Sequence, residues 1–250
     1  MIVLKSNHEI ELMREAGRIV AATHKKLADA IKPGITTLEL DKIAHEVITK
    51  NEAKPSFKGY HGFPASICTS INEEVVHGIP GIKRLNEGDI VSIDVGAEFK
   101  GYHGDAARTY PVGEVDDKML HLMRVTEQAL HKGIEQAYKG NRLSDISNAV
   151  EEHVKTHGFF VVKKYVGHGI GSQMHEPPEI PNFGPPGRGP RLKPGMVFAI
   201  EPMVNIGTSE VATKNDHWTV VTADGKASAH FEHTVAIFGG GPEILTQLSS

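Results

Sequence analysis

Four acidic side chains in strand-like segments, arranged as two pairs, are the residues of this sequence best suited to chemistry. Asp94 follows the mostly apolar segment 90–93, and Asp105 lies in a second strand-like segment beyond the short link 98–101. Both positions are equidistant from the middle of that link, so a simple antiparallel register would place their Cβ atoms roughly 4.5–5.5 Å apart. Two like charges facing each other between apolar strands are destabilising unless a proton or a cation lies between them. This register predicts a counter-ion; a shifted register, which would leave two exposed aspartates, is the alternative.

The second pair of acids occupies matching positions later in the chain. Glu201 follows the apolar run 197–200, and Glu232 lies on a segment whose pattern is typical of a half-buried strand. The segments 88–94 and 195–201 also align, because each has a turn glycine, an apolar run and then a carboxylate. We expect the two pairs to meet near the axis of a pseudo-symmetric arrangement.

Charge balance indicates what could hold four carboxylates together. With one neutral imidazole they carry four negative charges, which two divalent cations would balance. Such oxygen-rich ligation suits Mn, Fe(II), Co or a catalytic pair of Zn ions. Two metals roughly 3.5–4 Å apart activate water and polarise a carbonyl or phosphoryl group. His168 is the candidate imidazole because Gly167 and Gly169 leave its ring unobstructed; taken alone, the pattern also suits a loop histidine that is hydrogen-bonded locally.

The composition excludes several other classes of protein. The 250 residues are 39% hydrophobic and 23% charged, which is typical of a globular chain and not of a disordered one. The net charge of −4 implies no general attraction to nucleic acid, and no segment is apolar enough for a membrane span. The only cysteine, Cys68, excludes disulfides within the chain and cysteine-rich zinc modules. The prolines after His175 exclude a helical His-Glu-x-x-His zinc site.

These residues must be positioned by helices and strands that the sequence also marks. Ser6 with Glu9, and Thr36 with Glu39, form capping-box patterns at the start of helical apolar stripes. The spacing predicts helices from 6 to 31, from 36 onward, near 117–138, and from a cap at 144 to about 156. Each helical passage precedes strand-like segments, so we expect an α+β chain with halves of roughly 1–112 and 113–250. No linker divides the chain, which favours a single domain spanning 1–250.

Five of these residues, in their order along the chain, resemble the metal ligands of the pita-bread metallopeptidases: Asp94, Asp105, His168, Glu201 and Glu232. Essentially the whole sequence is similar to the short bacterial type I methionine aminopeptidases. The most specific matches are segments 58–64, 72–80, 94–96, 103–109, 167–171 and 201–202. The resemblance implies a pseudo-two-fold α+β fold in which two pairs of helices cover a curved antiparallel sheet.

The resemblance also implies a reaction and roles for these ligands. The enzyme would remove the N-terminal methionine from nascent proteins when the second residue is small. It would use two divalent metal ions per chain, drawn from Co, Mn, Fe(II) or Zn. Asp94 would hold one ion, Asp105 and Glu232 would bridge both, and His168 with Glu201 would complete the second. A hydroxide bridging the metals would attack the scissile carbonyl, with Glu201 as general base.

Two further histidines are implied to act on the substrate. His175 would stabilise the developing oxyanion, and His77 would contact the amide next to the cleaved bond. Without the resemblance, the segment around His77 would predict a core histidine satisfied by the backbone.

A methionine side chain needs a slot of aromatic and soft apolar groups. Similar enzymes place there the residues that match Tyr60, Phe63, Cys68 and Trp218, with Met203 as a further candidate. On its own, Trp218 would read as ordinary core, and Cys68 as a pocket-lining thiol more readily than as a nucleophile. Positions that depart from the family pattern, and so bear on side-chain preference, are Phe57, Phe63, Met174 and His230.

The nearest alternative is an Xaa-Pro aminopeptidase or prolidase, which shares the five ligands but has a sizeable N-terminal domain before them. Here the helices of the shared fold begin by Ser6. A non-catalytic binding protein on the same fold is the alternative from another class, and it would normally have lost ligands. The expected partners are N-termini of nascent polypeptides and, transiently, the ribosome, with no direct contact to nucleic acid or membrane. We expect a cytoplasmic monomer.

Overall fold

A computed structural model describes residues 2–248, in which the helices form two pairs. The helices are α1 (Asn7–Ala30), α2 (Thr37–Lys50), α3 (Asp117–Ile134) and α4 (Leu143–Thr156), with a 3-10 turn, η1 (Tyr60–Gly62). The capping boxes predicted for α1 and α2 are present: the Ser6 hydroxyl accepts the Glu9 N–H at 3.3 Å, and Thr36 accepts from Glu39 at 3.2 Å. Local hydrogen bonding therefore sets the start of both helices.

The second pair of helices departs slightly from the predicted bounds. α3 ends before position 138 because the N–H groups of Gln136 and Ala137 donate to carbonyls three residues back, as in tight turns. α4 is not capped by Ser144, whose hydroxyl accepts from the Arg188 N–H. Its N-cap is Arg142, two residues earlier, where the carboxylate of Asp145 accepts the Arg142 N–H at 2.7 Å.

The strands are short apart from one long hairpin, and all their pairings are antiparallel. In the first half they are β1 (Lys54–Pro55), β2 (Ile67–Ile71), β3 (Glu74–Val76), β4 (Ile90–Phe99) and β5 (Tyr102–Pro111). In the second half they are β6 (Phe160–Val161), β7 (Gly167–Gly169), β8 (Glu176–Ile180), β9 (Val197–Ile200), β10 (Met203–Asn205), β11 (Val211–Thr213), β12 (Val220–Thr222), β13 (Ser228–His230), β14 (His233–Phe238) and β15 (Gly241–Ile244).

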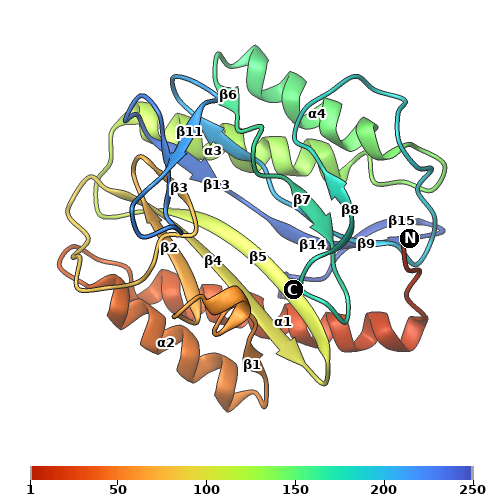
Figure 1. Ribbon diagram of the computed structural model, residues 1–250, viewed down its shortest axis with the longest axis horizontal. Helices are drawn as coiled ribbons and strands as arrows, with labels where there is room; N and C mark the ends of the chain where they lie inside the picture. The colour runs from red at the N-terminus through yellow and green to blue at the C-terminus, as the bar shows by residue number, and fades with distance from the viewer. Residues whose placement is uncertain (1, 249–250) are drawn as a thin grey trace.

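The two halves are built alike, as Figure 1 shows. Strands β1, β4, β2 and β5 form one sheet beside α1 and α2, and strands β15, β14, β9, β7 and β8 form another on the side of α3 and α4. The glycines that precede β4 and β9 share one conformation, since Gly88 and Gly195 both have a φ of 88°. This left-handed backbone favours glycine at both turns. The α+β class predicted from the sequence is confirmed.

The β4–β5 hairpin does not have the predicted register. Its turn is Lys100-Gly101, with φ values of 49° and 85°, as a two-residue hairpin turn of type I′ requires. Asp105 consequently pairs with Gly96, while Asp94 pairs with Ala107. The prediction that the two aspartates face each other directly is therefore wrong. Because the offset is two residues, they still lie on the same face as diagonal neighbours.

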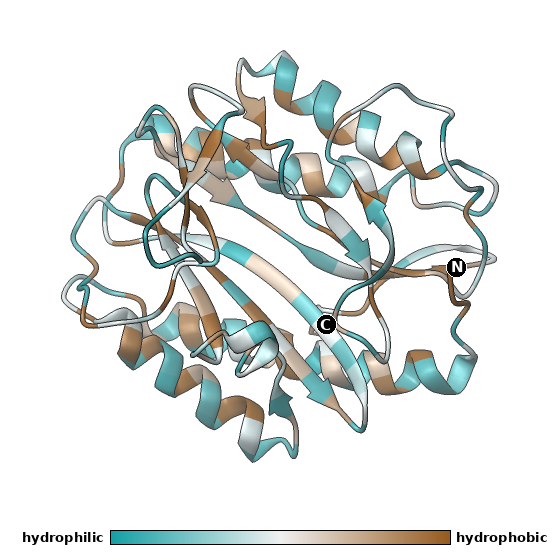
Figure 2. Ribbon diagram, in the orientation of Figure 1, coloured by the Kyte–Doolittle hydropathy of each residue, from teal (hydrophilic) through white to brown (hydrophobic). Residues whose placement is uncertain are grey.

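The apolar sides of the helices face the strands, as the hydropathy colouring in Figure 2 shows. One buried cluster joins α1, α2 and β4 around Ile19, Leu40 and Ile93, and another joins α3 and α4 to β9 around Leu130 and Phe198. Each half thus has its own apolar core, which holds the strands in place. Among residues 2–248, no helix combines the length and the apolar character needed to cross a bilayer.

Candidate active site

The four acids predicted from the sequence line one cavity of about 230 Å³, together with His168. Two of them come from the first half, Asp94 on β4 and Asp105 on β5. The other two come from the second half, Glu201 directly after β9 and Glu232 directly before β14. Residues from both halves of the chain are therefore needed to build this site.

Hydrogen bonds between the halves fix the backbones that carry these acids. The Asp105 N–H donates to the Thr234 hydroxyl at 2.9 Å, and that hydroxyl donates back to the Asp105 carbonyl at 2.8 Å. The Glu232 N–H donates to the carbonyl of Ala107 at 2.9 Å. All of these groups are buried. The acids thus sit on a rigid frame, as precise ligation requires.

The acids are poorly solvated for charged groups. Burial raises the pKa of Asp94 to about 6 and the pKa of Glu201 to about 8. The pKa values of Asp105 and Glu232 are also well above their usual range, first because of burial and then because of the neighbouring carboxylates. One oxygen each of Asp94, Asp105 and Glu232 is buried without any hydrogen-bond partner. Such a cluster requires protons or cations to offset its charge.

His168 is held with one nitrogen directed at the acids. Its Nδ1–H donates to the Gly169 carbonyl at 2.9 Å, which leaves Nε2 with a free lone pair. Nε2 lies 3.6 Å from Glu201 Oε1 and 3.8 Å from Asp105 Oδ2. Burial lowers the pKa of His168 to about 3, so the ring is neutral at physiological pH. A neutral histidine whose second nitrogen bonds a backbone carbonyl is the usual form of a metal ligand.

The flanking glycines allow the close packing that this position needs. A Cβ on Gly167 would lie 2.4 Å from the Ala199 carbonyl oxygen, and one on Gly169 would lie 2.4 Å from the Pro177 carbonyl oxygen. Any larger residue would push β7 away from its neighbours and move His168.

Apolar groups line the rest of the cavity. Phe63 and Trp218 meet edge to face, with ring centroids 5.1 Å apart. Cys68, Met203 and Tyr60 line the same cavity. Phe57 and Met174, which we predicted to depart from the family pattern, also line it. Burial raises the pKa of the Cys68 thiol well above its usual range, which excludes it as a thiolate nucleophile.

The two histidines that we predicted to contact the substrate also border this cavity. His77 is partly buried at a φ of 60°, and its ring meets that of Tyr165 edge to face at 5.6 Å. Burial lowers the pKa of His77 to about 4. His175 is exposed at the cavity mouth, with its ring 4.2 Å from that of His168 and its Nδ1 2.9 Å from the Tyr60 hydroxyl.

Comparison with known proteins identifies the family. The profile of metallopeptidase family M24 matches residues 11–238. The chain belongs to metallopeptidase family M24. It is 58% identical over 246 residues to the methionine aminopeptidase of Clostridium perfringens, which covers 98% of this chain and 99% of that one. The crystal structure of methionine aminopeptidase from Thermotoga maritima matches with a TM-score of 0.98 at 48% identity, covering 99% of this chain and all of that one. The resemblance drawn from the sequence motifs is confirmed.

Solved structures of prolidases are more distant from this chain. The prolidase of Pyrococcus furiosus matches with a TM-score of 0.80 at 25% identity, covering 99% of this chain but only 66% of that one. About a third of that prolidase therefore lies outside the shared fold. This M24 chain is closer in sequence and in extent to the methionine aminopeptidases.

An M24 metallopeptidase uses divalent cations, and the donors in this cavity fit them. Two groups offer ligand atoms that all lie within 4.8 Å of one another: Asp105, His168 and Glu232, and Glu201, His230 and Glu232. Glu232 belongs to both groups, as a carboxylate shared by two neighbouring ions would. The unbonded oxygen of Asp94 adds a further donor beside Asp105. Carboxylate oxygens with one or two imidazoles suit Mn, Fe(II), Co and Zn.

His230 is the residue that sequence reasoning assigned to the substrate pocket. The structure places it at the acids instead: on β13, its buried Nε2 lies 3.5 Å from Glu201 Oε2 and has no hydrogen-bond partner. Burial lowers the pKa of His230 to about 4, so it also offers a neutral ring. The spacing between His230 and Glu232 could have indicated this position from the sequence. Residues two apart on an extended backbone face the same side, and Glu232 follows His230 by two positions.

Proposed function

We propose that this chain is a methionine aminopeptidase that removes the N-terminal methionine from nascent proteins when the second residue is small. One observation carries the proposal: the slot bordered by Phe63, Cys68 and Trp218 belongs to the same cavity as the acid cluster. An apolar side chain in that slot would place the adjoining peptide bond at the acids. The cavity has a volume of about 230 Å³, which suits one unbranched side chain and not a long extended peptide.

The acids and His168 would hold two divalent cations. Asp94 would serve one ion, Asp105 and Glu232 would serve both, and His168 with Glu201 would serve the second. When bound, the cations supply the Lewis acidity that polarises a carbonyl and lowers the pKa of water. The donors fit Mn, Fe(II), Co or Zn, and His230 is a further candidate donor.

Side chains of the protein would transfer the proton, stabilise the oxyanion and orient the substrate. Glu201 takes the proton of the attacking water and passes it to the leaving amine, since its carboxylate borders the cavity. His175 donates to the developing oxyanion: when the Tyr60 hydroxyl donates to Nδ1, the proton of the neutral ring resides on Nε2. His77, also neutral, hydrogen-bonds the amide next to the cleaved bond and orients the substrate.

The proposed substrate also leads us to propose an oligomeric state, a cellular location and binding partners. Residues 1–250 would act as one catalytic domain, working as a monomer in the cytoplasm on chains that emerge from the ribosome. The partners are then nascent N-termini and, transiently, the ribosome, without direct contact to nucleic acid or membrane.

The test is release of free methionine from Met-Ala-Ser by metal-stripped protein, before and after addition of Mn(II) or Co(II). We expect release that depends on the metal, and much slower release from Met-Leu-Ser because of its bulky second residue. Peptides of the Xaa-Pro type serve as the comparison. Hydrolysis of the Xaa-Pro peptides alone would refute the proposed function. So would the absence of any peptide hydrolysis with every divalent metal tested.

A further inference from the structure

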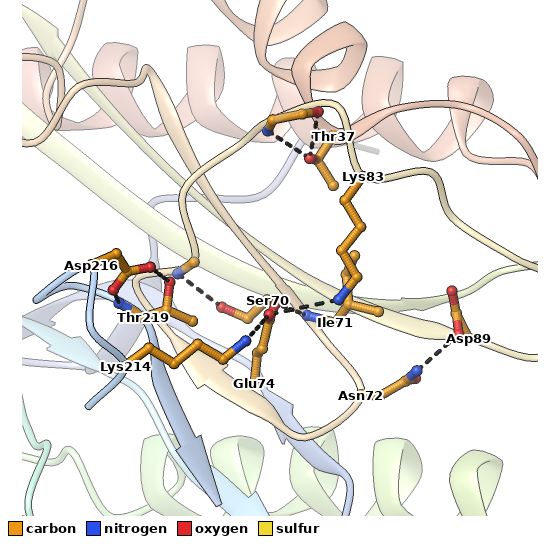
Figure 3. A network of polar contacts seen from close by, with 12 residues as sticks. Thr37, Ser70, Ile71, Asn72, Glu74, Lys83, Asp89, Lys214, Asp216 and Thr219 are labelled. Atoms are coloured by element: carbon orange, nitrogen blue, oxygen red, sulfur yellow. Dashed lines mark hydrogen bonds and ion pairs between the residues drawn. The ribbon is translucent and has the colours of Figure 1, made fainter. Parts of the chain in front are cut away.

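A network of polar contacts lies around Glu74 (Figure 3), and none of Glu74, Lys83 and Lys214 lines the substrate cavity. Glu74 is 7% exposed, at the start of β3. Its Oε1 accepts from Lys214 Nζ at 2.7 Å and lies 3.6 Å from Lys83 Nζ. Its Oε2 accepts the Ile71 N–H at 2.9 Å, which fixes the turn between β2 and β3. One buried carboxylate thus holds its own turn and contacts two loops, one with Lys214 and the other with Lys83.

The first of these loops carries Trp218. Lys214 and Trp218 lie in the same loop between β11 and β12, which the Lys214 N–H closes by donating to the Thr219 carbonyl at 2.8 Å. Asp216 holds the tip of this loop, because its Oδ1 accepts the N–H groups of Trp218 and Thr219 at 2.9 and 2.8 Å. The loop is therefore stiff internally. Lys214 is the side chain that ties this stiff unit to Glu74, as Figure 3 shows.

The second of these loops carries His77. Lys83 lies in the loop that follows His77, and the Lys83 carbonyl accepts the Thr37 N–H at the start of α2 at 3.1 Å. A cavity of about 300 Å³ borders this loop, and Gly78 and Thr219 both line it. The neighbouring residues His77 and Trp218 line the substrate cavity. The wall between the two cavities therefore consists of the segments 77–78 and 218–219, with the network around Glu74 on the side of the second cavity.

We propose that the Glu74–Lys214 ion pair, supported by Lys83, is a positioning device that sets how closely the Trp218 wall approaches Phe63, and so determines the selectivity for methionine. The inference rests on the proposed function for its substrate, but not for the placement of Trp218. Glu74 and its lysines do not line the substrate cavity, so their effect is transmitted through the loop.

The physical argument is that, besides the packing of Trp218 on Phe63 and the short pairings of β12, the ion pair with Glu74 is what ties this loop to β3. Trp218 is partly exposed, and the loop residues 212–217 are exposed. The short pairing of β12 with β3 contains an irregularity at 220/221, next to the loop. The Glu74 end of the pair is buried, where charge interactions are stronger than in water, although the Lys214 side chain is 41% exposed. Loss of the charge would free the loop without removing any group from the substrate cavity.

Trp218 is the only tryptophan, so its fluorescence reports on this wall directly. The variants are Glu74→Gln, which keeps an acceptor for the Ile71 N–H, and Lys214→Met, which removes the charge and keeps most of the length of the side chain. We expect the acrylamide quenching constant of Trp218 to rise about 1.5- to twofold in both variants, because the loop opens more often. Lys214→Arg should restore the wild-type constant. Lys226→Met, which removes an exposed lysine paired with Asp224, is the matched control.

Steady-state kinetics provide the second readout. In Lys214→Met we expect the KM for Met-Ala-Ser to rise about five- to tenfold, with kcat within about twofold and discrimination against norleucine-Ala-Ser reduced, since a loosened pocket contributes less binding. Unchanged quenching in both variants, or a fall in kcat without a change in KM, would overturn the proposal. The quenching measurement does not require turnover. If the protein released no methionine, quenching would still test whether Glu74 and Lys214 position Trp218.

Discussion

At the scale of single residues, His175 differs from His168 in what it contacts. His168 Nε2 lies within 4 Å of two acids, whereas His175 bonds the Tyr60 hydroxyl and lies at the cavity mouth. We therefore expect His175→Ala to lower kcat about 10²- to 10³-fold, as loss of an oxyanion donor does, while bound metal stays within about 20% of wild type. Turnover of Met-Ala-Ser and metal content by mass spectrometry give both quantities. A loss of metal in proportion to the loss of rate would make His175 a ligand instead.

His230 leads to a separate prediction about metal preference. Its neutral imidazole lies beside Glu201 with an unused, buried Nε2. Imidazole favours Zn and Co over Mn, which prefers oxygen donors. His230→Gln should weaken Zn(II) or Co(II) binding about 10- to 100-fold and Mn(II) binding much less. Competitive dialysis against a chelator of known affinity measures this, with His8→Gln on the exposed start of α1 as control. Equal losses for all three metals would show that His230 only supports Glu201.

At the scale of elements, the contact of α1 with the strands leaves no room for side chains at one point. A Cβ on Gly17 of α1 would lie 2.2 Å from the Leu245 carbonyl oxygen, and one on Gly104 of β5 would lie 2.7 Å from the Gly17 nitrogen. Alanine ordinarily stabilises a helix relative to glycine by about 1 kcal/mol. Here we expect Gly17→Ala to destabilise by about 2–3 kcal/mol and to lower Tm by roughly 5–10 °C, because the backbone must move.

Thermal unfolding followed by circular dichroism measures this change. Gly81→Ala is the matched control, since a Cβ there meets nothing within 4 Å and its backbone is not left-handed. A Gly17→Ala variant as stable as wild type would mean that α1 can shift freely along β5. Since β5 carries Asp105, such freedom would also weaken the case for a rigid metal frame.

The elements also show which parts of the structure could be predicted. Capping boxes and turn glycines are local signals, so the starts of α1 and α2 and the equivalence of Gly88 and Gly195 followed from sequence. The register of β4–β5 did not, because two adjacent positive-φ residues at 100 and 101 moved the turn by one position. The placement of His230 and the Glu74–Lys214 pair depend on strands that meet only in the folded chain. No local pattern encodes the contact between Glu74 and Lys214, whereas the two-residue spacing between His230 and Glu232 is a partial local signal for His230.

At the scale of the whole molecule, the site joins the two halves of the chain, and the charges of its acids also destabilise their association. Each half contributes one buried and one partly buried acid, and their mutual repulsion must be offset for the halves to close. Bound cations would therefore stabilise the folded chain as well as serve catalysis, because they bind the assembled site and not the unfolded chain. Removal of metal should consequently make stability depend on pH.

The sign of that dependence follows from the shifted groups. An acid whose pKa is raised in the folded state binds more protons folded than unfolded, so unfolding free energy falls as pH rises between its two pKa values. For Glu201 those values are 4.5 and about 8, and for Asp94 they are 3.8 and about 6. His168 and His230 have lowered pKa values of about 3 and about 4, so their opposite effect is complete above 6.5, the ordinary histidine value.

Between pH 6.5 and 8 the acids alone therefore determine the trend, and the metal-free protein should lose about 1–2 kcal/mol of stability as pH rises. With Mn(II) or Co(II) bound, the acids are already ionised, so the loss should largely vanish over the same range. In Asp105→Asn, added metal should restore little, because a buried ligand is missing. Urea unfolding at several pH values, with and without metal, measures the slope. A metal-free protein that grows more stable from pH 6.5 to 8 would show that the acids are charged and satisfied without cations, contrary to their burial and unbonded oxygens.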